Sequence, residues 1–277
     1  MLSLLTRRSR TLPNLQRVLA AAGREGQAAA GEREIPLSRI VGSASGTSKV
    51  AEFDPAFLPL SPRMRERWMR VYQAMTEGGE LPPIEVYKVG DDYYVSDGHH
   101  RVSVARALGR GTIPARVTEV RTRAPLPPGA DPADLLRAAE YRQFLERTHL
   151  DKTRPEARLE CSRLGRYEEI LRHIGGHGYF LGLERGRPVS VEEAAASWYD
   201  NVYLPVVKTI RRHKVLEALA GWTETDLYVE VTRRWLELGE AGEEAGPHQA
   251  LHRLADEGAL RALSPLWRRK PLRLGVD

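Results

Sequence analysis

The stretch from Leu81 to Val120 constrains the fold of this chain most strongly, because a strand, a polar turn and a helix follow one another within it. Residues 93–95 favour a strand, and residues 99–108 favour a helix. Between them stands Asp97-Gly98-His99-His100-Arg101. The first turn of a helix carries unpaired backbone N–H groups and the positive end of the helix dipole. The pattern therefore predicts an anion site, and we interpret it as a nucleotide or phosphate site.

The residue types in this turn support that interpretation. Gly98 would let a phosphate approach the backbone, His99 and His100 offer N–H donors, and Arg101 can bind a phosphate through two parallel hydrogen bonds. Asp97 has two interpretations: it closes the turn and caps the helix, or it contacts the ligand. We expect ligand contact, because packing of a core requires none of these side chains. Any Mg²⁺ would be held chiefly by the nucleotide, with Asp97 as the ligand from the protein.

Around this turn, the pattern predicts a β-α-β-β-α-β order. The expected elements are a strand over 34–41, a helix over 62–77, a hairpin of strands 84–89 and 92–96, the helix from His99, and a strand over 112–120. Upstream, Asn14 to Ala22 predicts a short amphipathic helix, and residues 24–32 predict a flexible connector. The Gly- and Ser-rich loop 42–49 is either a mobile surface loop or a lid, in which Thr47 and Ser48 would close over the phosphates.

The second half of the chain reads as helical. We expect helices over 131–147, within 155–173, over 189–212 with a kink or break at Pro205, and over 224–238 and 248–263. His173 and His177 have the i, i+4 spacing of a metal site, but Gly175-Gly176 between them disfavours a continuous helix. The predicted fold class is α+β, divided as follows: an N-terminal helix and connector (1–32), an α/β domain (33–120), a Pro-rich linker (121–130) and an all-helical domain (131–277).

Composition narrows the classes of function. The net charge of +5 and the pI near 9.4 suit anionic partners such as nucleotides or nucleic acid without requiring them. A single cysteine, Cys161, excludes a disulfide framework and a Cys-rich metal site, and it fits the cytoplasm. Because no apolar run approaches the length of a membrane span, we expect no membrane partner.

The central stretch resembles the ParB/sulfiredoxin superfamily domain. The residues that carry the resemblance are Pro82-Pro83-Ile84, the turn at 97–101, Ala-Arg-Ala-Leu-Gly at 105–109 and Ile-Pro-Ala-Arg-Val at 113–117. With the opening strand, the resemblance covers roughly residues 33–120 and implies a small α/β domain of that type. The helical half is similar to the uncharacterised C-terminal region of certain bacterial ParB-like proteins, which implies an architecture but no activity.

This superfamily is functionally divided. Partition-type ParB proteins use the equivalent turn to bind CTP and a separate helix-turn-helix to bind DNA. Sulfiredoxins have a catalytic Cys in the turn, which here holds His99, so sulfinic-acid repair is not expected. An archaeal free-serine kinase branch shares Asp-Gly-His-His-Arg. That resemblance implies that Asp97 takes part in catalysis, that His99, His100 and Arg101 hold phosphates, and that a Glu acts as base, for which Glu52 and Asp54 are the candidates.

Three functional hypotheses follow. The first is an NTPase or small-molecule kinase that uses ATP, ADP or CTP with Mg²⁺, and the helical domain would cover the site or form a homodimer. The second is a nucleotide-gated DNA-binding regulator, which needs a shared basic face of Arg211, Arg212, Lys214, Arg233 and Arg234. The third is a ParB-like nuclease, which the sequence disfavours because it offers no good pair of carboxylates for metal ions.

Overall fold

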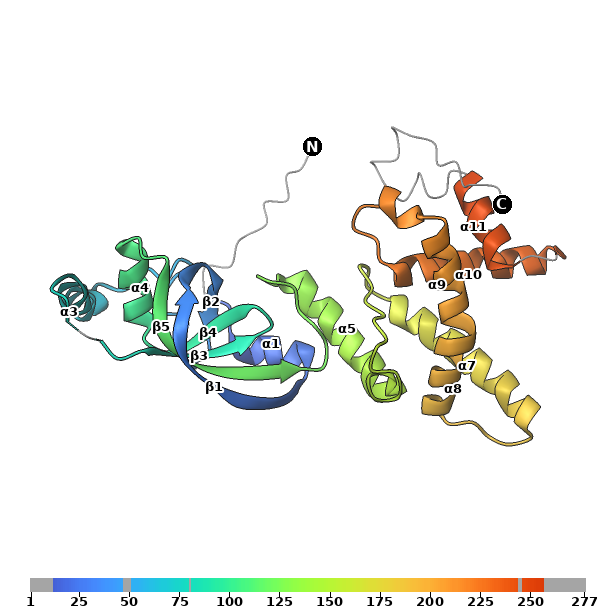
Figure 1. Cartoon of the computed structure of the whole chain (residues 1–277), viewed down its shortest axis with the longest axis horizontal. Coiled ribbons are helices and arrows are strands. Elements are labelled where there is room, and N and C mark those ends of the chain that lie inside the picture. The colour runs from blue at the N-terminus through green and yellow to red at the C-terminus, as the bar shows by residue number, and fades with distance from the viewer. Residues whose placement is uncertain (1–11, 47–50, 80, 244–245, 257–277) are drawn as a thin grey trace. The chain divides into compact units, whose positions relative to one another are not determined.

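The computed structural model describes residues 12–46, 51–79, 81–243 and 246–256 (Figure 1). The chain forms two compact units, which divide after Ala139, inside helix α5 (Pro132–Thr148). The first unit contains the sheet, and the second is helical throughout its regular structure. The predicted fold class, an α/β domain followed by a helical domain, is thus confirmed.

The first unit is a mixed five-stranded sheet with helices on both faces. Its strands lie in the order β1-β5-β3-β4-β2, where β1 pairs with β5 and β3 with β4 antiparallel, while β3–β5 and β2–β4 are parallel. The elements are α1 (Leu15–Ala22), β1 (Arg24–Pro36), β2 (Ile40–Ser43), α3 (Arg65–Thr76), β3 (Ile84–Val89), β4 (Asp92–Asp97), α4 (His99–Ala107) and β5 (Thr112–Thr122). The predicted hairpin and the helix after it are confirmed.

Alternation along the central strands sends apolar side chains to both faces of the sheet. On one face, the buried side chains of the strands pack with Val102 and Ala105 of α4 and with Phe53 and Phe57 of the loop after β2. On the other face, Val89, Tyr94 and Val120 pack against α1. The sheet therefore fixes where α4 begins, directly after the end of β4.

Residues 24–32 are not the flexible connector that we expected, because they form most of strand β1. This edge strand is exposed along most of its length, so its side chains do not alternate between apolar and polar. Its order comes from the backbone ladder to β5, which runs from Arg24↔Thr122 to Pro36↔Thr112 with two irregularities. Such a ladder leaves little trace in the pattern of side chains.

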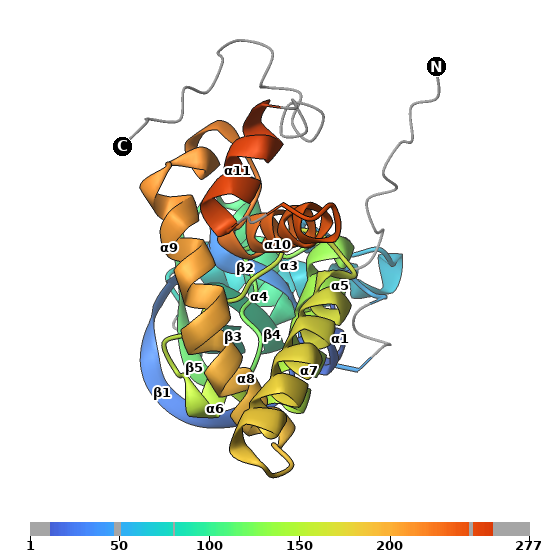
Figure 2. The same ribbon diagram turned by 90° about the vertical axis from the view of Figure 1, so that its right-hand side faces the viewer.

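The second unit is built of helices that follow one another along the chain (Figure 2). Its regular elements are the end of α5, α6 (Leu150–Thr153), α7 (Arg166–Arg185), α8 (Val191–Trp198), a π-helical turn (Tyr199–Tyr203), α9 (Leu204–Arg212), α10 (Glu224–Glu240) and α11 (Pro247–Asp256). The helix predicted over 189–212 is divided by the π turn, and Pro205 lies in the first turn of α9 directly after it. The backbone dihedrals stay helical across this junction, so Pro205 does not break the helix. The basic tail after Asp256 lies outside the described residues.

Helix α7 runs without interruption through Gly175 and Gly176, contrary to our expectation. Two further glycines on this helix explain its packing. A Cβ added to Gly178 would lie 2.8 Å from the Cβ of Ala194 on α8, and one added to Gly182 would lie 3.2 Å from the carbonyl oxygen of Arg187. Glycine is needed on α7 because α8 and its preceding loop approach the helix so closely.

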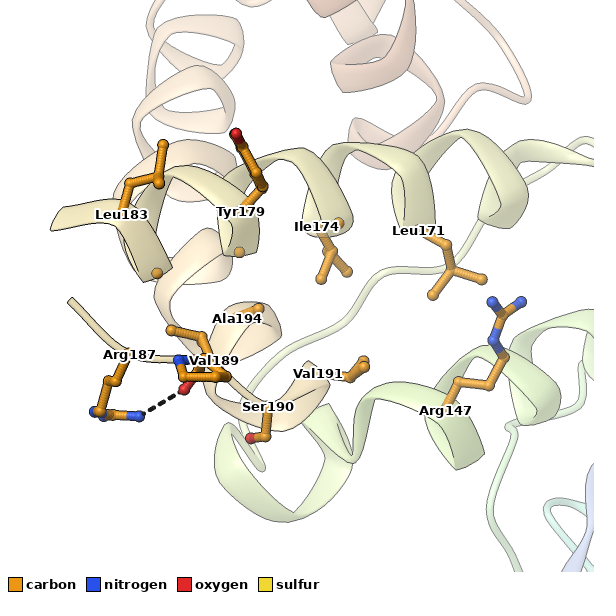
Figure 3. Close-up of a pocket in the computed structure, with 14 residues that line it drawn as sticks. Arg147, Leu171, Ile174, Tyr179, Leu183, Arg187, Val189, Ser190, Val191 and Ala194 are labelled. Atoms are coloured by element: carbon orange, nitrogen blue, oxygen red, sulfur yellow. Dashed lines mark hydrogen bonds between the residues drawn. The ribbon is translucent and has the colours of Figure 1, made fainter. Parts of the chain in front are cut away.

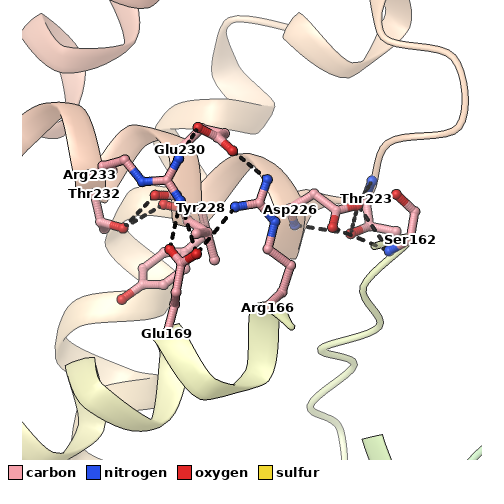
Figure 4. A network of polar contacts seen from close by, with 10 residues as sticks. Ser162, Arg166, Glu169, Thr223, Asp226, Tyr228, Glu230, Thr232 and Arg233 are labelled. Atoms are coloured by element: carbon pink, nitrogen blue, oxygen red, sulfur yellow. Dashed lines mark hydrogen bonds and ion pairs between the residues drawn. The ribbon is translucent and has the colours of Figure 1, made fainter. Parts of the chain in front are cut away.

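A polar network joins α7 to α10 (Figure 4). Arg166 pairs with Glu230, and Arg233 lies 2.9 Å from Glu169 and 3.2 Å from Glu230. Nearby, the carboxylate of Asp226 accepts hydrogen bonds from Ser162 N and from both the backbone and hydroxyl of Thr223, completing a capping box at the start of α10.

No helix in the described ranges is both long and apolar enough to span a membrane.

Candidate functional site

A pocket of about 240 Å³ opens at the first turn of α4. Its lining comes from the loop after β2, from α3, from the segment before β3 and from the turn between β4 and α4: Glu52, Phe53, Arg67, Val71, Leu81, Pro82, Asp97, Gly98, His99, His100 and Arg101. The structure thus brings six predicted site residues together. Asp54 is not among the lining residues, and Thr47 and Ser48 lie outside the described residues.

Gly98 is the residue that lets the chain pass directly from β4 into α4. Its φ of 100° lies in the left-handed region, which favours glycine. A Cβ at this position would lie 2.5 Å from Cγ2 of Ile84, a buried residue of β3, and 3.2 Å from Cζ of Arg101. Both the backbone conformation and the close packing against β3 therefore require glycine here.

Arg101 is held at the floor of the pocket by groups from two sides. Its Nη2 donates to Oδ2 of Asp97 at 2.5 Å, and its Nη1 donates to the carbonyl oxygens of Pro82 and, at 3.0 Å, Pro83. The arginine side chain is 13% exposed, whereas that of Asp97 is 52% exposed. The guanidinium is thus positioned in advance, and its carboxylate partner remains open to solvent.

The two histidines of the turn have different surroundings. His99 is buried, its Nε2 lies 2.8 Å from Oγ of Ser43, and its ring stacks on Phe53 at 5.5 Å between centroids. His100 is partly buried and meets Phe53 edge-on at 5.3 Å. His99 therefore ties the first turn of α4 to the end of β2, while His100 lies nearer the surface of the pocket.

The two candidate bases also differ. Glu52 is exposed at the mouth of the pocket. The Oδ1 of Asp54 instead accepts hydrogen bonds from the backbone N–H groups of Ala56 at 2.9 Å and Leu58 at 2.7 Å. Asp54 also interacts with Arg106: its negative charge raises the pKa of that guanidinium, whereas burial lowers it. Of the two carboxylates, the geometry leaves Glu52 available to a ligand.

The sequence did not point to Arg67 and Val71, which line the pocket from α3. They lie four residues apart and therefore share one face of that helix. The signal in the sequence is the set of exposed arginines at and before the start of α3, but only the fold shows that Arg67 faces the α4 turn. A second cation thus joins Arg101 at the pocket.

A larger pocket of about 770 Å³ lies in the helical unit between α7 and α8 (Figure 3). Its lining is mainly apolar, with Ile174 and Leu171 on one side and Val189 and Val191 on the other. The arginines at its edges are already paired, Arg147 with Glu168 and Arg187 with Glu193. Its described lining is thus mainly apolar and lacks the cluster of hydrogen-bond donors that lines the α4 pocket.

Other residues that the sequence suggested for a metal site or a reactive thiol are buried or hydrogen-bonded within the helical unit. His173 lies 3.1 Å from the hydroxyl of Tyr228, and His177 lies 2.9 Å from that of Ser197, so the i, i+4 pair is used for packing. Cys161 is buried, and burial raises the pKa of its thiol strongly, which disfavours a nucleophilic thiolate.

The basic face required by the DNA-binding hypothesis is partly neutralised. Three of its five cations are held by carboxylates, namely Arg211 by Glu224, Arg233 by Glu169 and Glu230, and Arg234 by Glu237. The helical unit therefore offers less free positive charge than its sequence suggests.

The first unit combines a mixed sheet with the strand–turn–helix that opens the pocket, as the predicted α/β domain requires. Residues 51–127 match the family model of the ParB N-terminal domain, and this range contains every residue that lines the α4 pocket. The predicted resemblance to this superfamily is confirmed. Strands β1 and β2 precede the matched range. No curated protein matches the chain.

The solved structures that are similar to this chain include a sulfiredoxin and ParB N-domains. Sulfiredoxin from Arabidopsis thaliana is 22% identical over 31% of this chain and 82% of its own, with a TM-score of 0.23. The C-terminally truncated chromosome-partitioning protein ParB from Caulobacter crescentus, complexed with CTP-gamma-S, is 17% identical over 88% and 96%, with a TM-score of 0.23. A pNOB8-like ParB N-domain is 14% identical over 88% and 90%, with a TM-score of 0.24. Likenesses at these TM-scores carry no inference about ligands.

Proposed function

We propose that this protein binds a nucleoside di- or triphosphate, with ATP, ADP and CTP as the candidates, in the pocket at the first turn of α4. The observation that carries the proposal is the gathering of two arginines, two histidines and the start of a helix around one small pocket. The positive end of the helix dipole at this turn favours an anion, and the arginines supply charge-assisted hydrogen bonds. The match of this region to the ParB N-terminal domain family supports the same conclusion.

Each residue has a distinct place in this proposal. Gly98 allows the phosphates to approach the backbone, and Arg101, Arg67 and His100 contact them. His99 is a positioning residue, because its buried ring links the turn to Ser43. The half-exposed carboxylate of Asp97 fits a hard cation, so Asp97 would hold Mg²⁺ that accompanies the nucleotide.

We further propose that the bound nucleotide is hydrolysed or transfers a phosphoryl group to a small molecule. Glu52 is the base in this proposal, because it is an exposed carboxylate on the rim of the pocket. It would accept the proton of an attacking hydroxyl or water. Arg101, Arg67 and the N–H groups of the turn would stabilise the charge that develops on the phosphoryl oxygens.

The first experiment is a titration of the full chain with ATP, ADP and CTP, with and without Mg²⁺, by thermal shift and calorimetry. Arg101→Ala should weaken binding by about 10- to 100-fold, the loss expected for one charge-assisted hydrogen bond of about 1.5–3 kcal/mol. Because Arg101 also holds Pro82 and Pro83, Arg67→Ala provides a second test that leaves those contacts intact.

Helix α3 offers a matched control for the second variant. Arg65 is exposed on the same helix and does not line the pocket, so Arg65→Ala should leave the affinity unchanged. The site is wrong if no nucleotide stabilises the wild type, or if Arg101→Ala and Arg67→Ala both bind as the wild type does. Phosphate release by Glu52→Gln then separates chemistry from binding, because this variant should bind the nucleotide but turn it over at least about 100-fold more slowly.

The family match and the exposed arginines around α3 favour a second candidate, a nucleotide-gated DNA-binding regulator. Arg63, Arg65, Arg67 and Arg70 are all exposed within eight positions of the chain. In this case, fluorescence anisotropy should show DNA binding that depends on nucleotide and weakens with salt. Arg63→Ala/Arg70→Ala should reduce both the affinity and the salt dependence, and an unchanged anisotropy curve would remove this candidate.

A further inference from the structure

Three histidines come together in the helical unit, far along the chain from the pocket residues. His213 follows the last residue of α9, and His248 and His252 lie one turn apart on α11. One ring nitrogen from each lies within 4.8 Å of the others, and the Nε2 atoms of His248 and His252 are 3.2 Å apart. The ring centroids of His213 lie 4.9 Å and 5.3 Å from those of His248 and His252.

These distances fit a small transition-metal ion. Four-coordinate Zn²⁺ binds histidine nitrogen at about 2.0–2.1 Å, which places two ligand nitrogens about 3.4 Å apart. The pair on α11 already meets this spacing, and the i, i+4 positions direct both rings to one side of the helix. The third nitrogen needs a movement of about 1 Å or a little more, within reach of a side-chain rotation at the partly buried His213.

The surroundings of His213 favour a metal over a simple hydrogen-bonded cluster. Its Nε2 is buried and has no hydrogen-bond partner in the described part of the chain, although it is a polar atom. The lone pair of such a buried ring nitrogen is available to a metal ion.

We propose that His213, His248 and His252 form a site for one Zn²⁺ ion that fastens α11 to the end of α9. Helix α11 has only ten residues, among which Ala250, Leu251 and Leu254 are buried and Arg253 pairs with Glu243. Three neutral imidazoles leave a fourth position for water or an exogenous ligand. The site is independent of the nucleotide proposal, because it uses none of the residues of the α4 pocket.

The test is a titration of metal-free, untagged full chain with Zn²⁺ against a competing chelator, without nucleotide. We expect one Zn²⁺ per chain, and a weakening of at least about 100-fold in His248→Ala and in His252→Ala, beyond the 10- to 100-fold produced by loss of an outer-shell partner. Co²⁺ in place of Zn²⁺ should give the intense visible bands of a four-coordinate site. Mg²⁺ should not compete, since imidazole is a poor ligand for it.

Hydrogen exchange provides a structural readout beside binding. Zn²⁺ should slow exchange of the backbone amides of α11 in the wild type and leave it unchanged in His213→Ala. His149→Asn is the control, because it removes an exposed histidine of the same unit and keeps a residue type that tolerates its φ of 50°. The proposal is overturned if the wild type binds no stoichiometric Zn²⁺, or if His248→Ala and His252→Ala keep its affinity.

Discussion

Arginine and carboxylate side chains meet both in the pocket at α4 and in the network between α7 and α10, but in different surroundings. In the helical unit, Arg166 and Glu230 have side chains that are only 9% and 11% exposed, and further ion pairs surround them. In the pocket, Arg101 is nearly as buried, but its partner Asp97 is half exposed. The arginine–carboxylate pair of the helical unit is thus shielded from solvent, whereas that of the pocket is open to solvent on its carboxylate side.

This difference separates a structural pair from one that a ligand can use. Opening the Arg166–Glu230 pair would leave buried charges with fewer partners, so the free energy of folding depends on it. Opening the Asp97–Arg101 pair exposes a carboxylate that already contacts water, and an incoming phosphate would take its place on the guanidinium. Pairs of the second kind can exchange partners at little cost.

The largest effect should come from breaking the buried network. We expect Arg166→Met to lower the free energy of unfolding by about 3 kcal/mol, the lower end for removal of one partner of a buried pair, because Arg233 still contacts Glu230. Urea denaturation followed by circular dichroism measures it. In the same unit, Arg147→Met removes an exposed pair with Glu168 and should cost less than about 1 kcal/mol. Equal losses in the two variants would contradict the comparison.

The pocket is most sensitive at Gly98, where the backbone rather than a charge pair determines the site. Gly98→Ala must hold alanine at a φ of 100° and place its Cβ against Ile84. We expect a loss of about 2 kcal/mol in the free energy of unfolding, and loss of nucleotide binding. The control is Gly109→Ala, which also has a positive φ but no atom within 4 Å of the added Cβ. It should destabilise the fold less and keep binding.

The sequence was sufficient for the elements that bury a periodic face or end in a recognisable cap. The strand–turn–helix at 92–107 and the helix that begins at Glu224 follow from local chemistry, and the structure confirms them. Strand β1 was missed because its order comes from pairing with β5, which the pattern of one segment does not contain. The continuity of α7 was missed because Gly175-Gly176 disfavours a helix locally, whereas α7 packs closely against α8 through Gly178, which the local pattern does not reveal.

In the site, too, residues that are close in sequence could be predicted, whereas contacts between distant segments could not. The turn at 97–101 could be proposed from residue types, and Glu52 from the resemblance to the free-serine kinase branch; the structure places them around one pocket. Arg67 could not be assigned, because its relation to that turn depends on how α3 packs on the domain. The histidine cluster was missed for the same reason, since His213 lies 35 residues before His248 and only the packing of α9 and α11 joins them.

The smallest effect on stability should come from Asp97→Asn, and it sharpens the comparison most directly. The pair with Arg101 is open to solvent, so we expect a change of less than about 1 kcal/mol in the free energy of unfolding by urea denaturation. Binding of a nucleotide without Mg²⁺ should be kept or strengthened, because the guanidinium loses its competing carboxylate. The additional affinity gained with Mg²⁺ should disappear if Asp97 holds the cation. A stability loss as large as that of Arg166→Met would instead show that the pocket pair is structural, and that a phosphate cannot displace Asp97 cheaply.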